Sequence, residues 1–191
     1  ELWKSDGTEA GTVLVKDIFL GTGDSWSEYL TAVGNTLFFT ARDPVHGVEL
    51  WKSDGTEAGT VLVKDIDSGT GNAWPGYLTA VGNTLFFVVS DSVHGAELWK
   101  SDGTEAGTVL VKDIHSGSYG SYPEYLTAVG NTLYFSASTS SEGRELWTSD
   151  GTEAGTVLVK DINVGTNGSG PYYLTALGES LYFVAYDTVH G

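Results

Sequence analysis

The side chains best suited to bind a ligand lie in four corresponding stretches, residues 19–29, 67–77, 115–125 and 163–173, called here the variable links. Their aromatic and small polar candidates are Trp26, Trp74, Tyr122, Tyr172, Asp24, Asn72 and Asn167. A sugar ring can stack on an aromatic face while its hydroxyls bond nearby polar groups. These residues therefore suit glycan binding, although aromatic rings that fill gaps between structural units would leave the same pattern.

Acidic residues stand directly before the variable links. The four equivalents are Asp17, Asp65, Asp113 and Asp161. Carboxylate oxygens are ligands for Ca²⁺, so with Asp24, Asp67 or backbone carbonyls they form candidate calcium sites, and calcium is the one cofactor that the sequence suggests. The alternative is that these aspartates are solvated surface acids.

Two further sets of polar residues have a structural interpretation. Asp6 and its three equivalents lie in the segment SDGTEAGT, where an aspartate before glycine accepts backbone N–H groups in a tight loop. His46 and His94 stand three residues before a glutamate, His190 has the equivalent position in the last copy, and Glu142 takes the histidine position in the third copy. A metal pair is conceivable there. A hydrogen bond between neighbouring structural units is the favoured prediction.

No catalytic motif accompanies these residues. The chain has no Gly-x-Ser-x-Gly elbow, P-loop, dinucleotide fingerprint or zinc-protease motif. Its carboxylates recur fourfold, whereas catalytic sites are single and asymmetric. We therefore predict that the protein is not an enzyme, and that equivalent sites in each copy serve multivalent binding.

A repeat of 48 residues organises the whole chain. Glu1-Leu2-Trp3 recurs at 49, 97 and 145, and the segment ELWKSDGTEAGTVLVKDI is identical in the first three copies. The chain thus reads as one repeat domain, 1–191. Its repeats are 1–48, 49–96, 97–144 and 145–191.

Each repeat contains four predicted strands, at 30–33, 36–41, 48–52 and 60–66 in one copy, because β-branched and aromatic runs alternate with Gly, Asn and Asp. The pattern predicts an all-β fold, a β-propeller of four-stranded antiparallel blades. The chain starts in a third strand and ends after a second strand, so the N- and C-terminal strands are expected to close the last blade together. The alternative is that the chain is a piece of a longer array that forms a larger ring. The tryptophans of the third strands are expected to pack between blades.

The motif Glu-Leu-Trp-x-x-Asp-Gly-Thr at 1–8, 49–56, 97–104 and 145–152 resembles that of the bacterial ELWxxDGT repeat proteins. The resemblance covers all four copies. It implies a repeat of large, often exported bacterial proteins, and it implies no particular activity.

Composition narrows the partners. The formal net charge of −16 disfavours nucleic acid, no apolar stretch is long enough for a membrane helix, and the absence of cysteine excludes disulfides. We predict a secreted or cell-surface binding or scaffold module, lectin-like, whose variable face binds a glycan or a protein. The alternative is a purely structural repeat of a bacterial adhesin or matrix protein. A monomer or a domain-swapped dimer is expected.

Overall fold

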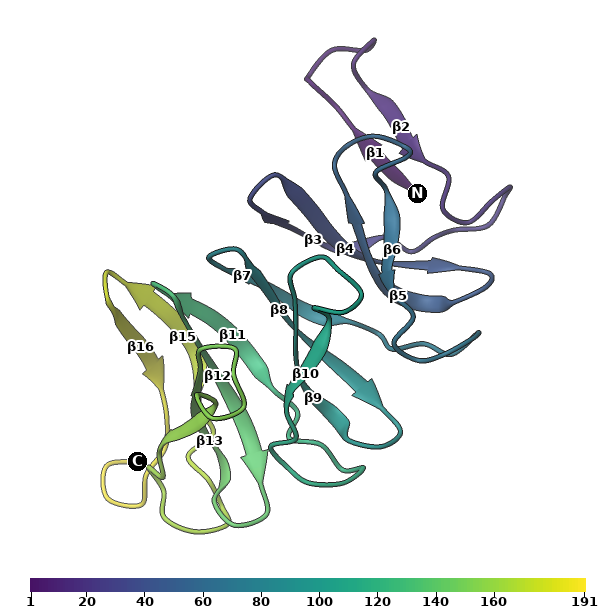
Figure 1. The fold of residues 1–191 in the computed structure, drawn as a ribbon. Coiled ribbons are helices and arrows are strands. Elements are labelled where there is room, and N and C mark those ends of the chain that lie inside the picture. Colours follow the sequence, from purple (N-terminus) through teal and green to yellow (C-terminus); the bar gives the residue numbers. More distant parts are fainter.

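The computed structural model describes residues 1–191 and consists of β-strands, turns and loops (Figure 1). Three antiparallel sheets have four strands each, in the orders β3-β4-β5-β6, β7-β8-β9-β10 and β11-β12-β13-β14. Two-stranded sheets, β1-β2 and β15-β16, stand at the two ends of the chain. The structure holds no helix that could cross a membrane.

Consecutive strands pair in every sheet, so each four-stranded sheet is a meander, as the sequence predicts, and runs from the second half of one repeat into the first half of the next. The strands are β1 (Leu2–Lys4), β2 (Val13–Lys16), β3 (Glu28–Val33), β4 (Thr36–Asp43), β5 (Gly47–Ser53), β6 (Val61–Lys64), β7 (Gly76–Val81), β8 (Thr84–Asp91), β9 (Gly95–Ser101), β10 (Val109–Lys112), β11 (Glu124–Val129), β12 (Thr132–Thr139), β13 (Gly143–Ser149), β14 (Val157–Lys160), β15 (Tyr172–Leu177) and β16 (Ser180–Val184).

The fourth strand of each repeat is shorter than predicted. In the first complete sheet it ends at Lys64 and not at Ile66. The reason lies in the backbone: the N–H of Ile66 donates to the carboxylate of Glu49, at 3.1 Å, instead of continuing the ladder. The buried side chain of Glu49 thus takes the place of the neighbouring strand as the hydrogen-bond acceptor for the N–H of Ile66.

The loop that joins the third and fourth strands has the predicted aspartate turn. Asp54 Oδ1 accepts hydrogen bonds from the N–H and the hydroxyl of Thr56, at 2.9 and 2.7 Å. The same pair of bonds holds the other copies of the loop. Because these donors favour the ionised form, they lower the pKa of the aspartates. The carboxylate thus stabilises the conformation of its own loop.

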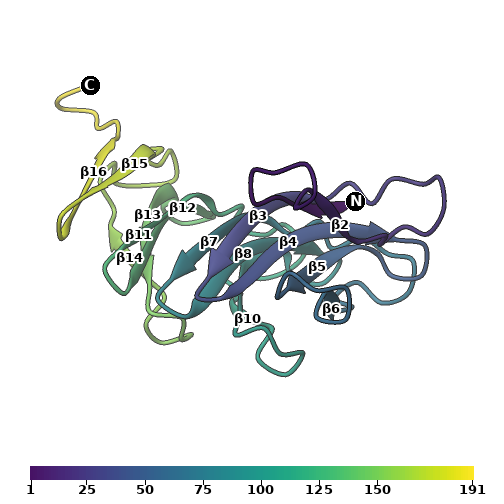
Figure 2. The same cartoon turned by 90° about the horizontal axis from the view of Figure 1, so that it is seen from above.

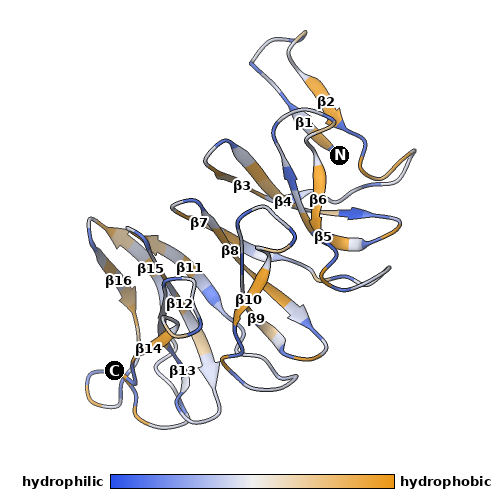
Figure 3. Ribbon diagram, viewed as in Figure 1, coloured by the Kyte–Doolittle hydropathy of each residue, from blue (hydrophilic) through white to orange (hydrophobic).

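The hydrophobic core lies between successive sheets. Phe38, Leu50 and Val63 of one sheet pack with Leu85 and Phe87 of the next sheet in a single buried cluster. A second cluster joins the next pair of sheets in the same way. The hydrophobic stretches lie mainly within the strands, while the loops are mostly hydrophilic or intermediate (Figure 3). Burial between sheets is the main source of stability in a chain without disulfides.

The third-strand tryptophans confirm the predicted packing in three copies. Trp51, Trp99 and Trp147 are buried, at 6%, 9% and 8% exposure, each in a cluster with the preceding sheet. Trp3 is 59% exposed. The difference arises because no sheet lies before β1 and β2 in this structure.

The first strands of the sheets lie side by side along one border. β3, β7, β11 and β15 contact one another in succession, and the hydroxyl of Thr31 donates to the carbonyl of Leu78 at 3.3 Å. The sheets trace an open arc, with β1-β2 and β15-β16 at its opposite ends (Figures 1 and 2). The predicted closure of the last sheet by both termini is not observed here, because β1 and β16 do not pair.

The variable links lie against the third strands, at the same end of the sheets as the links that join second and third strands. The N–H groups of Ala73 and Trp74 donate to the carbonyl of Val48, at 3.0 and 3.4 Å. The backbone of Arg42 likewise donates to Ser25, at 2.7 Å. Sequence variation among the copies is therefore concentrated on one face, as predicted.

Candidate functional site

The variable links at 67–77, 115–125 and 163–173 are anchored by the buried glutamate of the Glu-Leu-Trp motif, whereas in the first link Glu1 is half-buried and accepts only the N–H groups of Ile18 and Phe19. Glu49, which is 0% exposed, accepts the N–H of Asp67 and of Ala73 on Oε1, at 3.2 and 3.3 Å, besides that of Ile66 on Oε2. Burial raises the pKa of Glu49 to about 7. The three N–H donors favour the ionised form and oppose this rise, but burial has the larger effect. Glu49 thus holds the backbone at both ends of its link. The side chains between these ends are not needed for this anchoring and can take part in ligand binding.

The third and fourth copies add a hydroxyl to this anchor. Ser121 donates its N–H to Oε1 of Glu97 at 2.7 Å and its hydroxyl to Oε2 at 2.5 Å. Ser169 bonds Glu145 in the same way. The second copy has Ala73 at this position, so its carboxylate lacks that donor.

The histidines do not bond across repeats, so that prediction is wrong. His46 Nδ1 lies 2.7 Å from Asp43 Oδ2, three residues before it, and the pairs His94–Asp91 and His190–Asp187 repeat the contact. The aspartate also accepts the backbone N–H of the histidine. Each histidine therefore closes its own short link, and the glutamate beside it is engaged elsewhere.

The aromatic candidates have an unusual backbone. Trp26, Trp74 and Tyr122 have φ values of 47°, 47° and 48°, in the left-handed region that bulky residues rarely occupy. Their side chains are 48%, 57% and 57% exposed. Asp24 Oδ1 accepts the N–H of Trp26 at 2.9 Å and so helps to hold this conformation. The chain accepts local strain here, and the strain presents a large ring to solvent.

A tyrosine three residues further on repeats the pattern. The sequence did not single out Tyr29, Tyr77, Tyr125 and Tyr173, whose φ values are 56°, 55°, 57° and 55°. Each lies where the pairing of the first two strands is irregular, between Glu28 and Thr31 in one copy. A bulge of this kind turns a side chain out of the sheet. The three-residue spacing to the preceding aromatic, found in the first three copies, was the available signal.

Two cavities lie between Trp26 and Trp74, with volumes of about 370 and 390 Å³. Arg42, Thr70 and Asn72 line the first cavity. The second cavity reaches the first strands of two sheets, β3 and β7, and its lining residues include Glu28, Tyr29, Thr40 and Tyr77. Because both tryptophans border both cavities, we treat them as one site, the Trp26–Trp74 groove.

The structure brings together only part of the predicted set. Trp26, Trp74 and Asn72 meet in the groove, where Asn72 Oδ1 also accepts the N–H of Val48 at 2.9 Å. Asp24 acts as a support for Trp26 and does not line either cavity. The other candidates belong to later copies: Tyr122 is exposed in the third variable link, Asn167 is exposed in the fourth, and Tyr172 packs at 4.8 Å against the ring of Tyr173.

The candidate calcium ligands occur one per repeat. No group of three or more His, Asp or Glu side chains is placed to hold a metal ion. In Asp65, Asp113 and Asp161, Oδ1 is buried without a hydrogen-bond partner, while Oδ2 of Asp65 accepts the N–H of Gly69 at 3.1 Å. Calcium binding at Asp17 and its equivalents stays a prediction.

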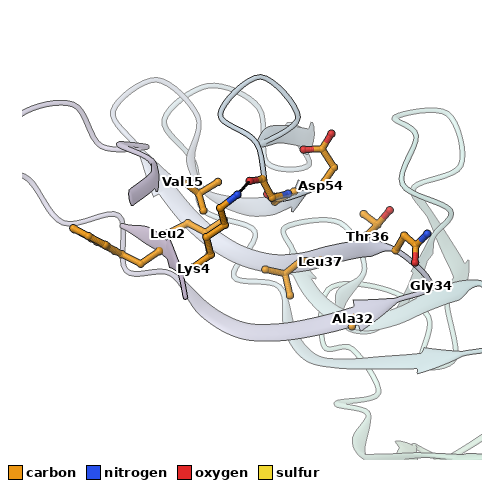
Figure 4. Close-up of a pocket in the computed structure, with 12 residues that line it drawn as sticks. Leu2, Lys4, Val15, Ala32, Gly34, Thr36, Leu37 and Asp54 are labelled. Atoms are coloured by element: carbon orange, nitrogen blue, oxygen red, sulfur yellow. Dashed lines mark hydrogen bonds between the residues drawn. The ribbon is translucent and has the colours of Figure 1, made fainter. Parts of the chain in front are cut away.

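A third cavity lies beside the free edge of β1, with a volume of about 300 Å³ (Figure 4). Leu2, Val15 and Leu37 supply apolar walls, and Lys4 reaches across to donate to the carbonyl of Gly55 at 2.7 Å. In the complete sheets the space next to the third strand is filled by the second strand. The cavity is thus the space beside a strand that lacks a neighbour.

Comparison with known proteins gives a likeness of fold. No family model matches the chain, so the resemblance to the ELWxxDGT proteins stays a prediction, and no curated protein matches it. Among solved structures the chain is similar to the apo form of AtxE2 isopeptidase, with a TM-score of 0.51 and 14% sequence identity over 80% of this chain. The matched part is 23% of that protein's length. At such identity the likeness concerns the arrangement of strands and carries no activity to this chain.

Proposed function

We propose that this protein is a non-enzymatic binding module of a secreted or cell-surface protein, and that the Trp26–Trp74 groove holds a sugar. The observation that carries the proposal is the left-handed backbone of two half-exposed tryptophans. A bulky residue in this region costs on the order of 1–3 kcal/mol, and such strain concentrates at ligand sites. Packing alone gives no reason to present these rings to solvent.

The polar groups of the groove suit hydroxyl recognition. Asn72 is held through Oδ1, and its side-chain NH₂ makes no hydrogen bond within the chain, so both of its donors can serve a ligand. Thr70 contributes a hydroxyl to the first cavity, whereas the hydroxyl of Thr40 in the second cavity donates to the carbonyl of Pro75 at 2.7 Å and can only accept. Rigid aromatic faces with a few fixed polar groups are the usual composition of a sugar site.

A glycan array with titration of the best ligand tests this proposal. Trp26→Ala and Trp74→Ala should each weaken binding at least about tenfold, a loss of about 1.4 kcal/mol, without lowering the melting temperature. Tyr119→Ala is the matched control, because Tyr119 is 78% exposed and lies outside the groove. If no carbohydrate binds the wild-type protein, the proposal fails and the architectural alternative, a structural repeat, is favoured.

We also propose that the repeats are blades of a β-propeller, and that β15 and β16 close the ring by docking beside β1. The registers of the complete sheets define the pairing. Phe38 opposes Lys52 and Phe39 opposes Trp51 between second and third strands. The equivalent pairs across the open ends are Tyr182 with Lys4 and Phe183 with Trp3.

Exposed surfaces at the two ends support this docking. Phe38 lies over Gly103, where a Cβ would be 3.2 Å from its ring, and Phe86 lies over Gly151 in the same way. The equivalent ring is Tyr182, which is 59% exposed, and the equivalent glycine lines the cavity beside β1. Closure would fill this cavity with the tyrosine ring.

The opposite face of the same blade has a second complementary pair. Val63 and Val111, on fourth strands, are buried in the clusters that hold the tryptophan of the following sheet. Val159 is 48% exposed and Trp3 is 59% exposed. Closure would bring these two side chains into the same contact.

A cysteine pair tests closure, since the chain has no cysteine of its own. Lys4→Cys with Tyr182→Cys should form a disulfide within one chain under mild oxidation, detected by faster migration in non-reducing gels. Lys4→Cys with Tyr119→Cys is the control and should not cross-link. Cross-linked dimers would show strand exchange between copies in place of closure, and absence of any cross-link would overturn the pairing.

A further inference from the structure

We propose that the Trp26–Trp74 groove is selective for a sugar that carries a carboxylate, and that Arg42 is the residue that binds this group. The inference rests on the proposed function and names the ligand class of the same site. Arg42 lies on β4 and lines the cavity that also contains Thr70 and Asn72. It is the only basic side chain among the residues that line the two cavities.

The guanidinium group of Arg42 is positioned by two rings. Its Cζ lies 5.1 Å from the ring centroid of Phe19 and 4.8 Å from that of Trp26. Both distances are in the range of cation–π attraction, so the group is held in place at the mouth of the cavity. A fixed planar fork loses little freedom when it binds a carboxylate in a bidentate manner.

The donors of Arg42 are unused within the protein. Its guanidinium makes no hydrogen bond and no ion pair, although Asp43 is the next residue. The carboxylate of Asp43 is occupied by the N–H groups of Val45 and His46 and by the ring of His46. Asp43 and Glu28 also line the cavities, but neither pairs with Arg42, so a ligand carboxylate would meet unused donors that must outweigh the repulsion from these two acids.

The second arginine of this face provides a contrast. Arg144 pairs with Glu124 at 3.2 Å and donates to the carbonyl of Tyr122 at 3.1 Å, so its charge is satisfied. The equivalents of Arg42 in the other repeats are Ser90, Ser138 and Tyr186, each marked by the same backbone hydrogen bond to the preceding link. Acid recognition is consequently a property of one groove and not of all repeats.

The lysines of the chain do not contribute to this face. The ammonium groups of Lys4, Lys16, Lys52, Lys64 and Lys112 donate to carbonyls in the loops between third and fourth strands, as Lys52 does to Gly103 at 2.7 Å and Lys64 to Thr108 at 2.9 Å. The chain has a net charge of −16, so an arginine without an acidic partner is a local positive charge on an acidic protein. An anion that reaches the groove is held by short-range hydrogen bonds and not by the field of the whole protein.

Titration calorimetry with matched ligands tests the inference. The ligands are oligosaccharides that end in glucuronate, galacturonate or N-acetylneuraminate, each as the free acid and as its methyl ester. At least one acid should bind the wild-type protein about tenfold more tightly than its ester, since an ionised carboxylate accepts stronger hydrogen bonds from a guanidinium than a neutral ester does. Arg42→Gln should abolish the preference for the acid over its ester, Arg42→Lys should retain part of that preference, and Arg144→Gln should retain all of it.

Three outcomes would overturn the inference. Equal binding of acid and ester, lost in Trp74→Ala, would leave the sugar site intact and refute the role of Arg42. A preference that persists in Arg42→Gln would place the carboxylate elsewhere. Absence of binding to every acid and every ester would refute the acidic-sugar site, and the glycan array would then decide whether a neutral sugar binds.

Discussion

The substitution Ala73→Ser should stabilise the protein, and more so at alkaline than at acidic pH. Ala73 is 0% exposed and its N–H already donates to Glu49. Serine occupies the equivalent position in the third copy, where the hydroxyl of Ser121 donates to Glu97. The repeat geometry is the same, so a serine at 73 should place its hydroxyl against the carboxylate of Glu49.

The pH dependence follows from the raised pKa of Glu49. Its ordinary value is 4.5 and its value in the fold is about 7, so the folded chain binds the proton more tightly than the unfolded chain. Stability from this residue is fully present below about pH 4.5 and is lost as pH rises through about 7. A new hydroxyl donor favours the ionised form, lowers the pKa and recovers part of that loss.

The expected gain is about 1–2 kcal/mol at pH 8, because a hydrogen bond to a charged group adds roughly 1.5–3 kcal/mol and the hydroxyl must be desolvated. At pH 4.5 the carboxyl is neutral and the gain should fall below about 0.5 kcal/mol. Thermal denaturation at both pH values measures it, as a rise of about 2–6 °C at pH 8. Ser121→Ala is the reverse control and should cost more at pH 8. A gain that is equal at both pH values, or a loss at pH 8, would refute the role of Glu49 as a charged anchor.

Three further predictions concern the scaffold. Gly95→Ala should cost more than about 2 kcal/mol in urea denaturation, because φ is +70° and the new Cβ would lie 2.5 Å from backbone nitrogen, whereas Gly34→Ala, with φ +58° and open space, should cost about 1 kcal/mol. Equal costs would contradict this account of close packing. Asp91 raises the pKa of His94, so the stabilisation is present at low pH and is lost as pH rises through the raised pKa; His94→Ala should therefore lower the melting temperature more at pH 5.5 than at pH 8.5. A pH-independent effect would exclude the charged pair. Trp99→Phe should cost about 1–2 kcal/mol against about 3–5 for Trp99→Ala, because the buried indole N–H has no partner to lose, and similar costs would show that the N–H is bonded to water.

The strand pattern was predictable because it depends on local chemistry. Gly34 and its equivalents form tight turns, and runs such as TLFFTA alternate between the two faces of a sheet. The burial of Trp51 between sheets followed from size and position. The extent of the fourth strand did not follow, because it depends on Glu49, which lies 17 residues before Ile66 and takes over its N–H.

The site was predictable in composition but not in geometry. Aromatic residues in the variable links indicated a binding face. The presence of a Trp or Tyr does not predict a left-handed backbone, because the steric bulk of the side chain disfavours that conformation. The role of Arg42 was missed because only the fold brings it against Phe19 and Trp26. His46 was assigned to a long-range contact although Asp43, three residues earlier, was the nearer acceptor.

The constant and the varied parts of the repeat depend on each other physically. A strained aromatic residue is tolerated only where the surrounding backbone is held firmly, and in three of the four links Glu49, Glu97 and Glu145 do this by accepting N–H groups at both ends of the link. These bonds involve backbone N–H groups, so side chains within the link can change without loss of the anchor. The position of Arg42 is an example: serine or tyrosine replaces it in the other repeats, while the backbone bond to the link is kept. Weakening the anchor should therefore impair ligand binding in any repeat, whereas changing one link should alter specificity in that groove alone.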